Sequence, residues 1–325
     1  MKNFQYLQPE NLKAASRAVR SRPQEAVLYA GGTDLLGLMK DRIVEPDLVV
    51  NLKGLRGLGG ISFGEKDGLR IGALTKISDL AEHPAVRERY PALTEAAKSV
   101  ASPQLRNMGT VGGNLCQRPR CWYFRGEFHC LRKGGDVCYA VNGENKFHCI
   151  TGGGPCFIVH PSDLAVALLA LDAAVHIYDG RKTRSVPIGR FFVLPETDVL
   201  HETILKPGEV VTEVRVPPPA PGTRSGYLKF TERAVWDFAI VSVAAAVQVD
   251  GGKIRAGKVA FGGVAPVPWQ EEAVNRGLSG LTANEASFGQ LAAKAFRGAS
   301  PLEQNGYKIP LARNLLKRLL LRLAG

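Results

Sequence analysis

The chain has 325 residues, which is long for one hydrophobic core and favours two domains. Its composition is that of a globular protein, and no apolar run approaches the roughly 18 residues that a membrane-spanning helix needs. The net charge is +12, but Lys and Arg are scattered rather than gathered with aromatic residues, which argues against nucleic-acid binding and favours an anionic cofactor or an acidic partner subunit.

The N-terminal segment, residues 1–10, lacks the apolar stretch and the small-residue cleavage site of a signal peptide. We therefore expect a cytoplasmic protein with no membrane span. Export to the periplasm together with a signal-bearing partner subunit remains the alternative.

The first half of the chain alternates short helices and strands, which indicates α/β or α+β packing. Apolar periodicity predicts helices over residues 8–20, 35–41, 75–81 and 91–100, and strands over residues 26–30, 47–52 and 69–73. The strand over 26–30 runs directly into Gly31, Gly32, Thr33 and Asp34 and then into a helix. A strand, a glycine turn and a helix N-terminus in this order present free backbone N–H groups to an anion.

A second glycine-rich turn covers residues 109–114 and also carries a Thr and an amide side chain. Neither turn is a G-x-G-x-x-G dinucleotide fingerprint, and neither has the Lys-Ser/Thr that follows the glycines of a P-loop. One glycine turn after a strand is more often ordinary turn chemistry than a phosphate site. With two such turns, a phosphate-bearing cofactor and a plain turn are supported about equally.

All six cysteines lie in one 41-residue stretch, between positions 116 and 156, with successive separations of 5, 9, 8, 11 and 7 residues. No C-x-x-C pair occurs, which argues against a zinc finger or ribbon and against the cysteine run of bacterial ferredoxins. The clustering also argues against a disulfide framework. The spacing is compatible with an iron–sulfur cluster in one looping segment, and a loop of free thiols or disulfides is the alternative. His129 and His148 each precede a cysteine directly and are expected either to support the site or to lie exposed to solvent, rather than to ligate a metal.

The second half begins with a predicted helix over residues 164–171 and ends with the longest helix of the chain. Strands are expected over residues 173–178, 184–186, 209–216, 226–231, 239–249 and 254–261, and helices over residues 269–277, 284–297 and 309–323. The proline-rich segment 217–222 interrupts regular structure and is the predicted domain boundary. The last helix is apolar with basic interruptions, and we expect it to pack on its own sheet.

Two charged residues in this half suggest a ligand. Asp163 stands at the start of the helix over 164–171, where it either caps the helix or bonds the polar edge of a flavin. Lys229 lies inside a strand pattern, where a lysine points either to solvent or to an anion. No Ser-His-Asp arrangement, Cys-His arrangement or carboxylate pair indicates a self-sufficient catalytic centre, and no catalytic residue is assigned.

Residues 28–35 and 107–114 together resemble the two FAD-binding signatures of the molybdenum hydroxylase flavoproteins. These are the medium subunits of carbon monoxide dehydrogenase, xanthine dehydrogenase and aldehyde oxidoreductases, and the resemblance covers nearly the whole chain. It implies an α+β fold with a two-lobed FAD-binding (PCMH-type) domain at residues 1–221, which contains a cysteine-rich cluster-binding insertion at 115–157. A domain like the C-terminal α/β domain of the CO dehydrogenase flavoprotein would follow at 222–325.

The same resemblance implies which residues hold the cofactors. FAD would be bound by Leu28, Tyr29, Ala30, Gly31, Gly32, Thr33, Asp34, Leu35, Thr110, Val111, Gly112, Gly113, Asn114, Asp163, Val211 and Lys229. The insertion resembles that of members with an additional [4Fe–4S] cluster, the periplasmic aldehyde oxidoreductase medium subunit and the 4-hydroxybenzoyl-CoA reductase β subunit. It implies the ligands Cys121, Cys130, Cys138 and Cys149, with Cys156 as the rival of Cys149 and Cys116 outside the set.

The resemblance further implies an electron-transfer subunit of a heterotrimer. A molybdopterin-binding large subunit would oxidise an aldehyde or a related substrate, and a [2Fe–2S] small subunit would connect it to the FAD of this chain. One alternative is a stand-alone FAD oxidoreductase with a structural cysteine loop. Another is a zinc-stabilised interaction module, which the missing C-x-x-C pairs disfavour.

Overall fold

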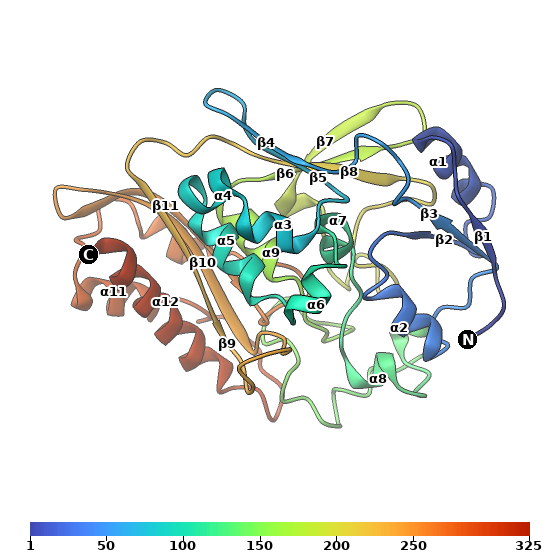
Figure 1. Cartoon of the computed structure of the whole chain (residues 1–325). Helices are drawn as coiled ribbons and strands as arrows, with labels where there is room; N and C mark the ends of the chain where they lie inside the picture. Colours follow the sequence, from blue (N-terminus) through green and yellow to red (C-terminus); the bar gives the residue numbers. More distant parts are fainter.

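Three β-sheets organise the chain, and the computed structural model describes all of residues 1–325. A parallel three-stranded sheet lies near the N-terminus, a five-stranded sheet follows, and an antiparallel three-stranded sheet lies near the C-terminus. Figure 1 shows the first sheet at the right and the last at the left, with a group of helices between them beneath the five-stranded sheet. The α+β fold predicted from the sequence is confirmed.

The N-terminal sheet has the strand order β1-β3-β2 and two short helices on its connections. Its elements are β1 (Gln5–Leu7), α1 (Leu12–Arg20), β2 (Ala26–Tyr29), α2 (Leu35–Lys40) and β3 (Leu48–Asn51). The prediction of a helix from residue 8 was wrong by one turn. The Asn11 side chain accepts a hydrogen bond from the Ala14 backbone N–H at 2.9 Å and so caps the helix at that point.

The five-stranded sheet is antiparallel throughout and has the order β4-β5-β8-β6-β7. Its strands are β4 (Ile61–Gly64), β5 (Gly68–Gly72), β6 (Ala174–Tyr178), β7 (Thr183–Pro187) and β8 (Val210–Val216). The helices beneath it are α3 (Ile77–Glu82), α4 (Pro84–Arg89), α5 (Pro91–Ser99), α6 (Pro103–Arg106), α7 (Val111–Leu115) and α9 (Asp163–Ala170). Every residue of α9 is buried, and this helix therefore lies at the centre of the largest hydrophobic core.

The C-terminal part contains β9 (Thr223–Phe230), β10 (Val241–Asp250), β11 (Lys253–Gly262), α10 (Glu272–Arg276), α11 (Glu285–Ala292) and α12 (Lys308–Ala324). Both faces of its sheet are buried. Ala244 and Ala260 belong to the core shared with α9, whereas their neighbours Val243 and Val259 belong to the core shared with α12. Burial on both faces explains why β10 is an almost continuous apolar run. The expectation that the last helix packs on its own sheet is confirmed.

The segment 115–157 contains almost no regular structure. It holds only α8 (Trp122–Arg125) and a 3₁₀ turn over Leu131–Lys133; a second 3₁₀ turn, Ile188–Arg190, lies outside it. The C-terminal end of segment 115–157 is held in place by side chains of α12 and of the residues that precede α12. Lys308 is fully buried, and its Nζ donates to the carbonyl oxygens of Phe147, His148 and Gly263 at 2.8, 2.9 and 2.7 Å.

We expect Lys308→Met to lower the free energy of unfolding by roughly 2–4 kcal/mol, because three carbonyl oxygens would each lose a charged donor and only that of His148 would keep another, from Asn305. Chemical denaturation followed by circular dichroism measures the effect. The matched control is Lys317→Met on the same helix, whose ammonium forms a solvent-screened ion pair with Glu285 at 2.7 Å and is expected to contribute much less. Equal effects of the two substitutions would contradict the assignment of Lys308 as the fastening residue.

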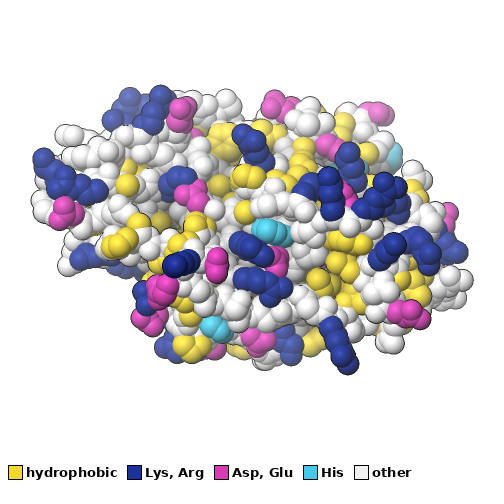
Figure 2. Space-filling view, turned by 90° about the horizontal axis from the view of Figure 1, so that it is seen from above, with side chains coloured by type: hydrophobic (Ala, Val, Ile, Leu, Met, Phe, Trp, Pro, Cys, Tyr) yellow, Lys and Arg dark blue, Asp and Glu magenta, His cyan; other side chains and the backbone are white.

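Figure 2 shows the face above the five-stranded sheet. Lys and Arg side chains lie there in scattered groups with acidic and apolar side chains between them. No helix of the structure combines the length and the apolar character needed to cross a bilayer.

Candidate functional site

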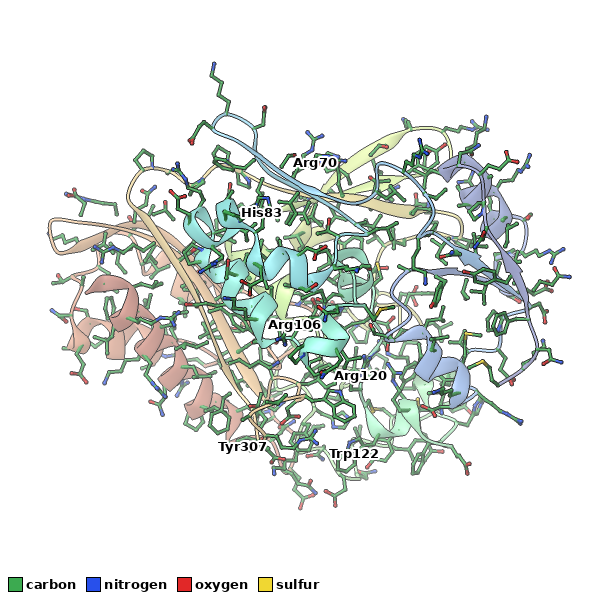
Figure 3. The ribbon with its side chains drawn as sticks, viewed as in Figure 1. Arg70, His83, Arg106, Arg120, Trp122 and Tyr307 are labelled. Atoms are coloured by element: carbon green, nitrogen blue, oxygen red, sulfur yellow. The ribbon has the colours of Figure 1, made fainter.

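Two adjoining cavities lie where the first domain, segment 115–157 and the C-terminal sheet meet. The glycine-turn cavity has a volume of about 470 Å³ and is lined by residues that include Thr33, Asp34, Thr110, Gly113, Asn114 and Trp236. The aromatic cavity has a volume of about 410 Å³ and is lined by residues that include Cys121, Trp122, Phe147, His148, Ile158 and Ser242. Both are also lined by Arg120, Asp163 and Phe238. Figure 3 shows Arg120 and Trp122 at this junction, near α8.

The first glycine turn, between β2 and α2, presents unpaired backbone donors. The N–H groups of residues 31–34 have no acceptor within the chain. Gly32 has φ +75°, a conformation that favours glycine, and its Cα faces the Tyr29 ring. Gly31 lies against the Met108 carbonyl so closely that a Cβ would overlap it. The two glycine turns are therefore in direct contact.

The second glycine turn is held more tightly. The Thr110 hydroxyl caps α7 by accepting from the Gly113 N–H at 3.2 Å, and the Asn114 amide oxygen accepts from the Ser162 hydroxyl at 2.5 Å. Val111 and Gly112 are buried, and their N–H groups bond the carbonyls of Thr75 and Ala73. Thr110, Gly113 and Asn114 therefore line the cavity, whereas Val111 and Gly112 support it from the core side.

The Asp34 carboxylate is held by segment 115–157. One oxygen accepts from the Arg118 backbone N–H at 2.8 Å, and the other lies 2.8 Å from both Arg120 and Arg125. The carboxylate makes no capping bond to α2. Two guanidinium groups against one carboxylate leave a net positive charge beside the unpaired N–H groups of residues 31–34. That environment suits an anion.

Asp163 is buried and forms a polar group with two residues of β9. Its oxygens accept from the Tyr227 hydroxyl at 2.6 Å and from Lys229 Nζ at 2.8 Å, and burial and the Asp163 charge raise the pKa of Tyr227. Ser162, not Asp163, caps α9, because its hydroxyl accepts from the Ala165 N–H at 3.0 Å. Lys229 points inward to an anion rather than to solvent. Asp163 thus presents a charged hydrogen-bonding edge to both cavities.

The remaining predicted FAD residues do not line the cavities. Leu28, Tyr29, Ala30 and Leu35 flank the first turn and fix its path, with the Tyr29 ring against Gly32. Val211 is buried in β8, where it pairs with Ile177. Any contribution of Val211 to FAD binding would be made indirectly, through the position of the sheet.

The loop between β9 and β10 was not predicted from the sequence to be part of the site. Arg233, Trp236, Asp237 and Phe238 from this loop line the glycine-turn cavity, and the Arg120 guanidinium lies 4.9 Å from the centre of the Phe238 ring. Trp236 is 63% exposed. Two large aromatic residues in a connection between two strands are a signal that could have identified the loop.

Four cysteines surround a separate small void within segment 115–157. Cys121, Cys130, Cys138 and Cys156 line it together with Arg132 and aromatic side chains. Cys149 is not in this lining; its sulfur is buried beside Gly153. All six cysteines are unpaired, so the disulfide alternative has no support. No three His, Cys, Asp or Glu side chains are close enough to hold a single metal ion.

The thiols of Cys121, Cys149 and Cys156 differ in acidity. The Cys138 thiol donates to Cys156, which together with the nearby Arg132 guanidinium lowers the pKa of Cys156 to about 6. Burial raises the pKa of Cys121 to about 11 and that of Cys149 to about 12. His148 Nε2 lies 3.2 Å from the Cys121 sulfur, and burial and the Lys308 charge lower the pKa of His148 to about 4. The imidazole is therefore neutral at neutral pH.

The fold and the cavity with its unpaired N–H groups define a two-domain protein that binds an anionic cofactor. Comparison with known proteins agrees with this class. Residues 2–219 match the family described as FAD binding domain in molybdopterin dehydrogenase, and residues 226–323 match the CO dehydrogenase flavoprotein C-terminal domain. The chain belongs to the FAD-binding medium subunits of the molybdenum hydroxylases and is therefore an oxidoreductase subunit.

Several relatives match over nearly their whole length. The aldehyde oxidoreductase FAD-binding subunit PaoB of Escherichia coli (strain K12) is 40% identical over 324 residues, which is 98% of each chain. The glyceraldehyde dehydrogenase medium chain of Sulfolobus acidocaldarius is 28% identical and is covered to 89%, with 92% of this chain matched. In a structure of carbon monoxide dehydrogenase from Hydrogenophaga pseudoflava, one chain superimposes with a TM-score of 0.77 at 28% identity, covering 98% of this chain and 96% of that one.

Proposed function

We infer that this chain is the FAD- and [4Fe–4S]-containing electron-transfer subunit of a heterotrimeric molybdenum hydroxylase that oxidises aldehydes. It would pass electrons between the [2Fe–2S] clusters of a small subunit and an external acceptor, while a molybdopterin-binding large subunit oxidises the substrate. The aldehyde class is supported by the printed activities of two relatives, the FAD-binding subunit PaoB and the glyceraldehyde dehydrogenase medium chain.

One observation carries this proposal. Cys121, His148 and Ile158 line both the aromatic cavity and the four-cysteine void, so the proposed flavin and cluster sites share a wall. Electron transfer needs two carriers close together, and a purely structural cysteine loop does not. The shared wall therefore favours an electron-transfer subunit over a stand-alone flavin oxidoreductase with a structural loop.

The residues around the glycine-turn cavity fit an FAD. The N–H groups of residues 31–34 and the Thr33 and Thr110 hydroxyls would bind the pyrophosphate, with Arg120 and Arg125 supplying positive charge. Asp163, fixed by Tyr227 and Lys229, would bond polar atoms of the flavin. A bound flavin supplies the capacity to store and release electrons, and the chain binds it, orients it and limits its contact with water.

The arrangement of the four thiols suits a cluster better than a single ion. A cubane cluster interposes several iron and sulfide atoms between its thiolates, so its ligands stand further apart than those of zinc. This agrees with four cysteines around one void and no three groups close enough for one ion. The set that the geometry favours is Cys121, Cys130, Cys138 and Cys156. We propose this set, in which Cys156 takes the place of Cys149.

The full chain purified without oxygen tests the proposal. We expect bound FAD together with about four iron and four sulfide per chain. We also expect no reduction by aldehydes in the absence of partner subunits, because the chain has no substrate-activating group of its own. Reduction by an aldehyde without partners would favour the stand-alone oxidoreductase, and zinc in place of iron would favour an interaction module.

A further inference from the structure

Arg132 is a buried guanidinium with unused donors. Its side chain is 1% exposed, and one terminal nitrogen donates to Glu202 at 2.7 Å. The Nε and the other terminal nitrogen are buried without any nitrogen or oxygen partner. Leaving a buried donor without an acceptor destabilises the fold, and more so when the donor is charged. We therefore expect a bound group to supply the acceptor for the free N–H groups of Arg132.

The position of the Arg132 guanidinium indicates which group would accept hydrogen bonds from its free N–H groups. It lines the same void as Cys121, Cys130, Cys138 and Cys156. In this void the acceptors that a bound cluster would add are sulfur atoms. Hydrogen bonds to these sulfurs and nearby charge are what a protein uses to set the reduction potential of a cluster.

The Glu202 carboxylate bonds Arg132 and also contacts Arg118, which lies nearer to the proposed flavin site. This buried carboxylate also receives the Arg118 guanidinium at 3.1 Å, and the Arg118 backbone N–H donates to Asp34 at 2.8 Å. A continuous set of polar contacts thus runs from the cysteine void through Arg132, Glu202 and Arg118 to the first glycine turn. Two arginines against one carboxylate leave positive charge on the cluster side.

We propose that Arg132 is a positioning residue for the cluster. Its free N–H groups donate to the cluster or to the Cys156 sulfur, and Glu202 fixes the orientation of the guanidinium. The inference rests on the proposed function. One-electron reduction makes the cluster more negative, so a fixed positive charge and two donors favour the reduced state. Arg132 therefore raises the reduction potential, whereas the charge of Glu202 lowers it.

The test is a redox titration of the anaerobic full chain, followed by the electron paramagnetic resonance of the reduced cluster. For Arg132→Gln we expect the one-electron reduction constant to fall by about tenfold or more, which is ~59 mV for one electron. For Glu202→Gln we expect a shift of opposite sign, because a negative charge is removed. The matched control is Lys133→Gln, which removes the adjacent, more exposed cation and should shift the potential less.

The outcomes separate this inference from the function on which it rests. A wild-type chain without iron would refute the proposed function. A wild-type chain with a cluster whose potential is the same in Arg132→Gln would refute only the role of Arg132. If Arg132→Gln loses its iron, the variants Arg132→Lys and Glu202→Gln test the role of Arg132 instead. The proposal requires that Arg132→Lys retain iron and that Glu202→Gln have a raised potential, and a Glu202→Gln potential at or below that of the wild type overturns it.

Discussion

Cys156→Ala is expected to remove the proposed iron–sulfur cluster, and Cys149→Ala to leave it in place. Cys156 lines the void with Cys121, Cys130 and Cys138, and its depressed pKa of about 6 would supply a thiolate ligand for the proposed cluster. Cys149 is outside the void, and burial raises its pKa to about 12. Iron and sulfide analysis should fall from about four of each per chain to near zero in Cys156→Ala alone.

The pair of substitutions is matched in chemistry, because both remove one buried sulfur from the same segment. Each leaves a small cavity that costs on the order of 1 kcal/mol. A general loss of folding would therefore affect both variants alike, and far-ultraviolet circular dichroism reports it. Iron lost from Cys149→Ala and retained in Cys156→Ala would restore the ligand set implied by the family resemblance.

Gly31→Ala is expected to weaken FAD binding by roughly tenfold to a hundredfold. A Cβ at this position overlaps the Met108 carbonyl oxygen, and backbone on both sides leaves no flexible group to move aside. Overpacking of this kind costs about 1–3 kcal/mol. The two glycine turns would relieve it by separating, which displaces the N–H groups of residues 31–34. Flavin content after purification and a fluorescence titration of the FAD-free chain measure the loss.

Gly54→Ala is the control for this prediction. A Cβ at Gly54 meets nothing within 4 Å, its φ is not positive, and it lies outside the lining of the glycine-turn cavity. We expect its FAD affinity and stability to be close to those of the wild type. If Gly31→Ala binds FAD as tightly as Gly54→Ala, the contact between the two turns is not part of the cofactor site.

Long elements with a strong apolar pattern could be predicted from the sequence, whereas several short ones could not. The patterns that led to α9, β10, β11 and α12 extend over eight or more residues. β4, α4 and α6 have only four to six residues and were not expected. An element of one turn or one short strand shows no periodicity, because tertiary contacts and proline positions form it rather than its own pattern.

The candidate site, too, could be predicted only in part from the sequence. Sequence alone identified the two glycine turns and selected Asp163 and Lys229, since each combines an unusual residue type with a recognisable local context. Arg120 and Arg132 could be named only among the basic residues near the cysteines, and Glu202 was not identified, because scattered arginines and glutamates carry no local signal of their partners. Their importance depends on burial and on partners far away in the chain, such as the 70 residues that separate Arg132 from Glu202.

The sequence by itself determined that this chain has glycine turns suited to a nucleotide, a cysteine-rich segment without zinc spacing, and a proline-rich break before its last strands. These are local facts of order and spacing. Only the tertiary structure placed Cys156, and not Cys149, in the lining of one void with Cys121, Cys130 and Cys138, and showed that Asp34 is held by arginines of segment 115–157. The physical reason is that spacing limits which groups can meet, whereas burial and packing against the whole fold select which of them do.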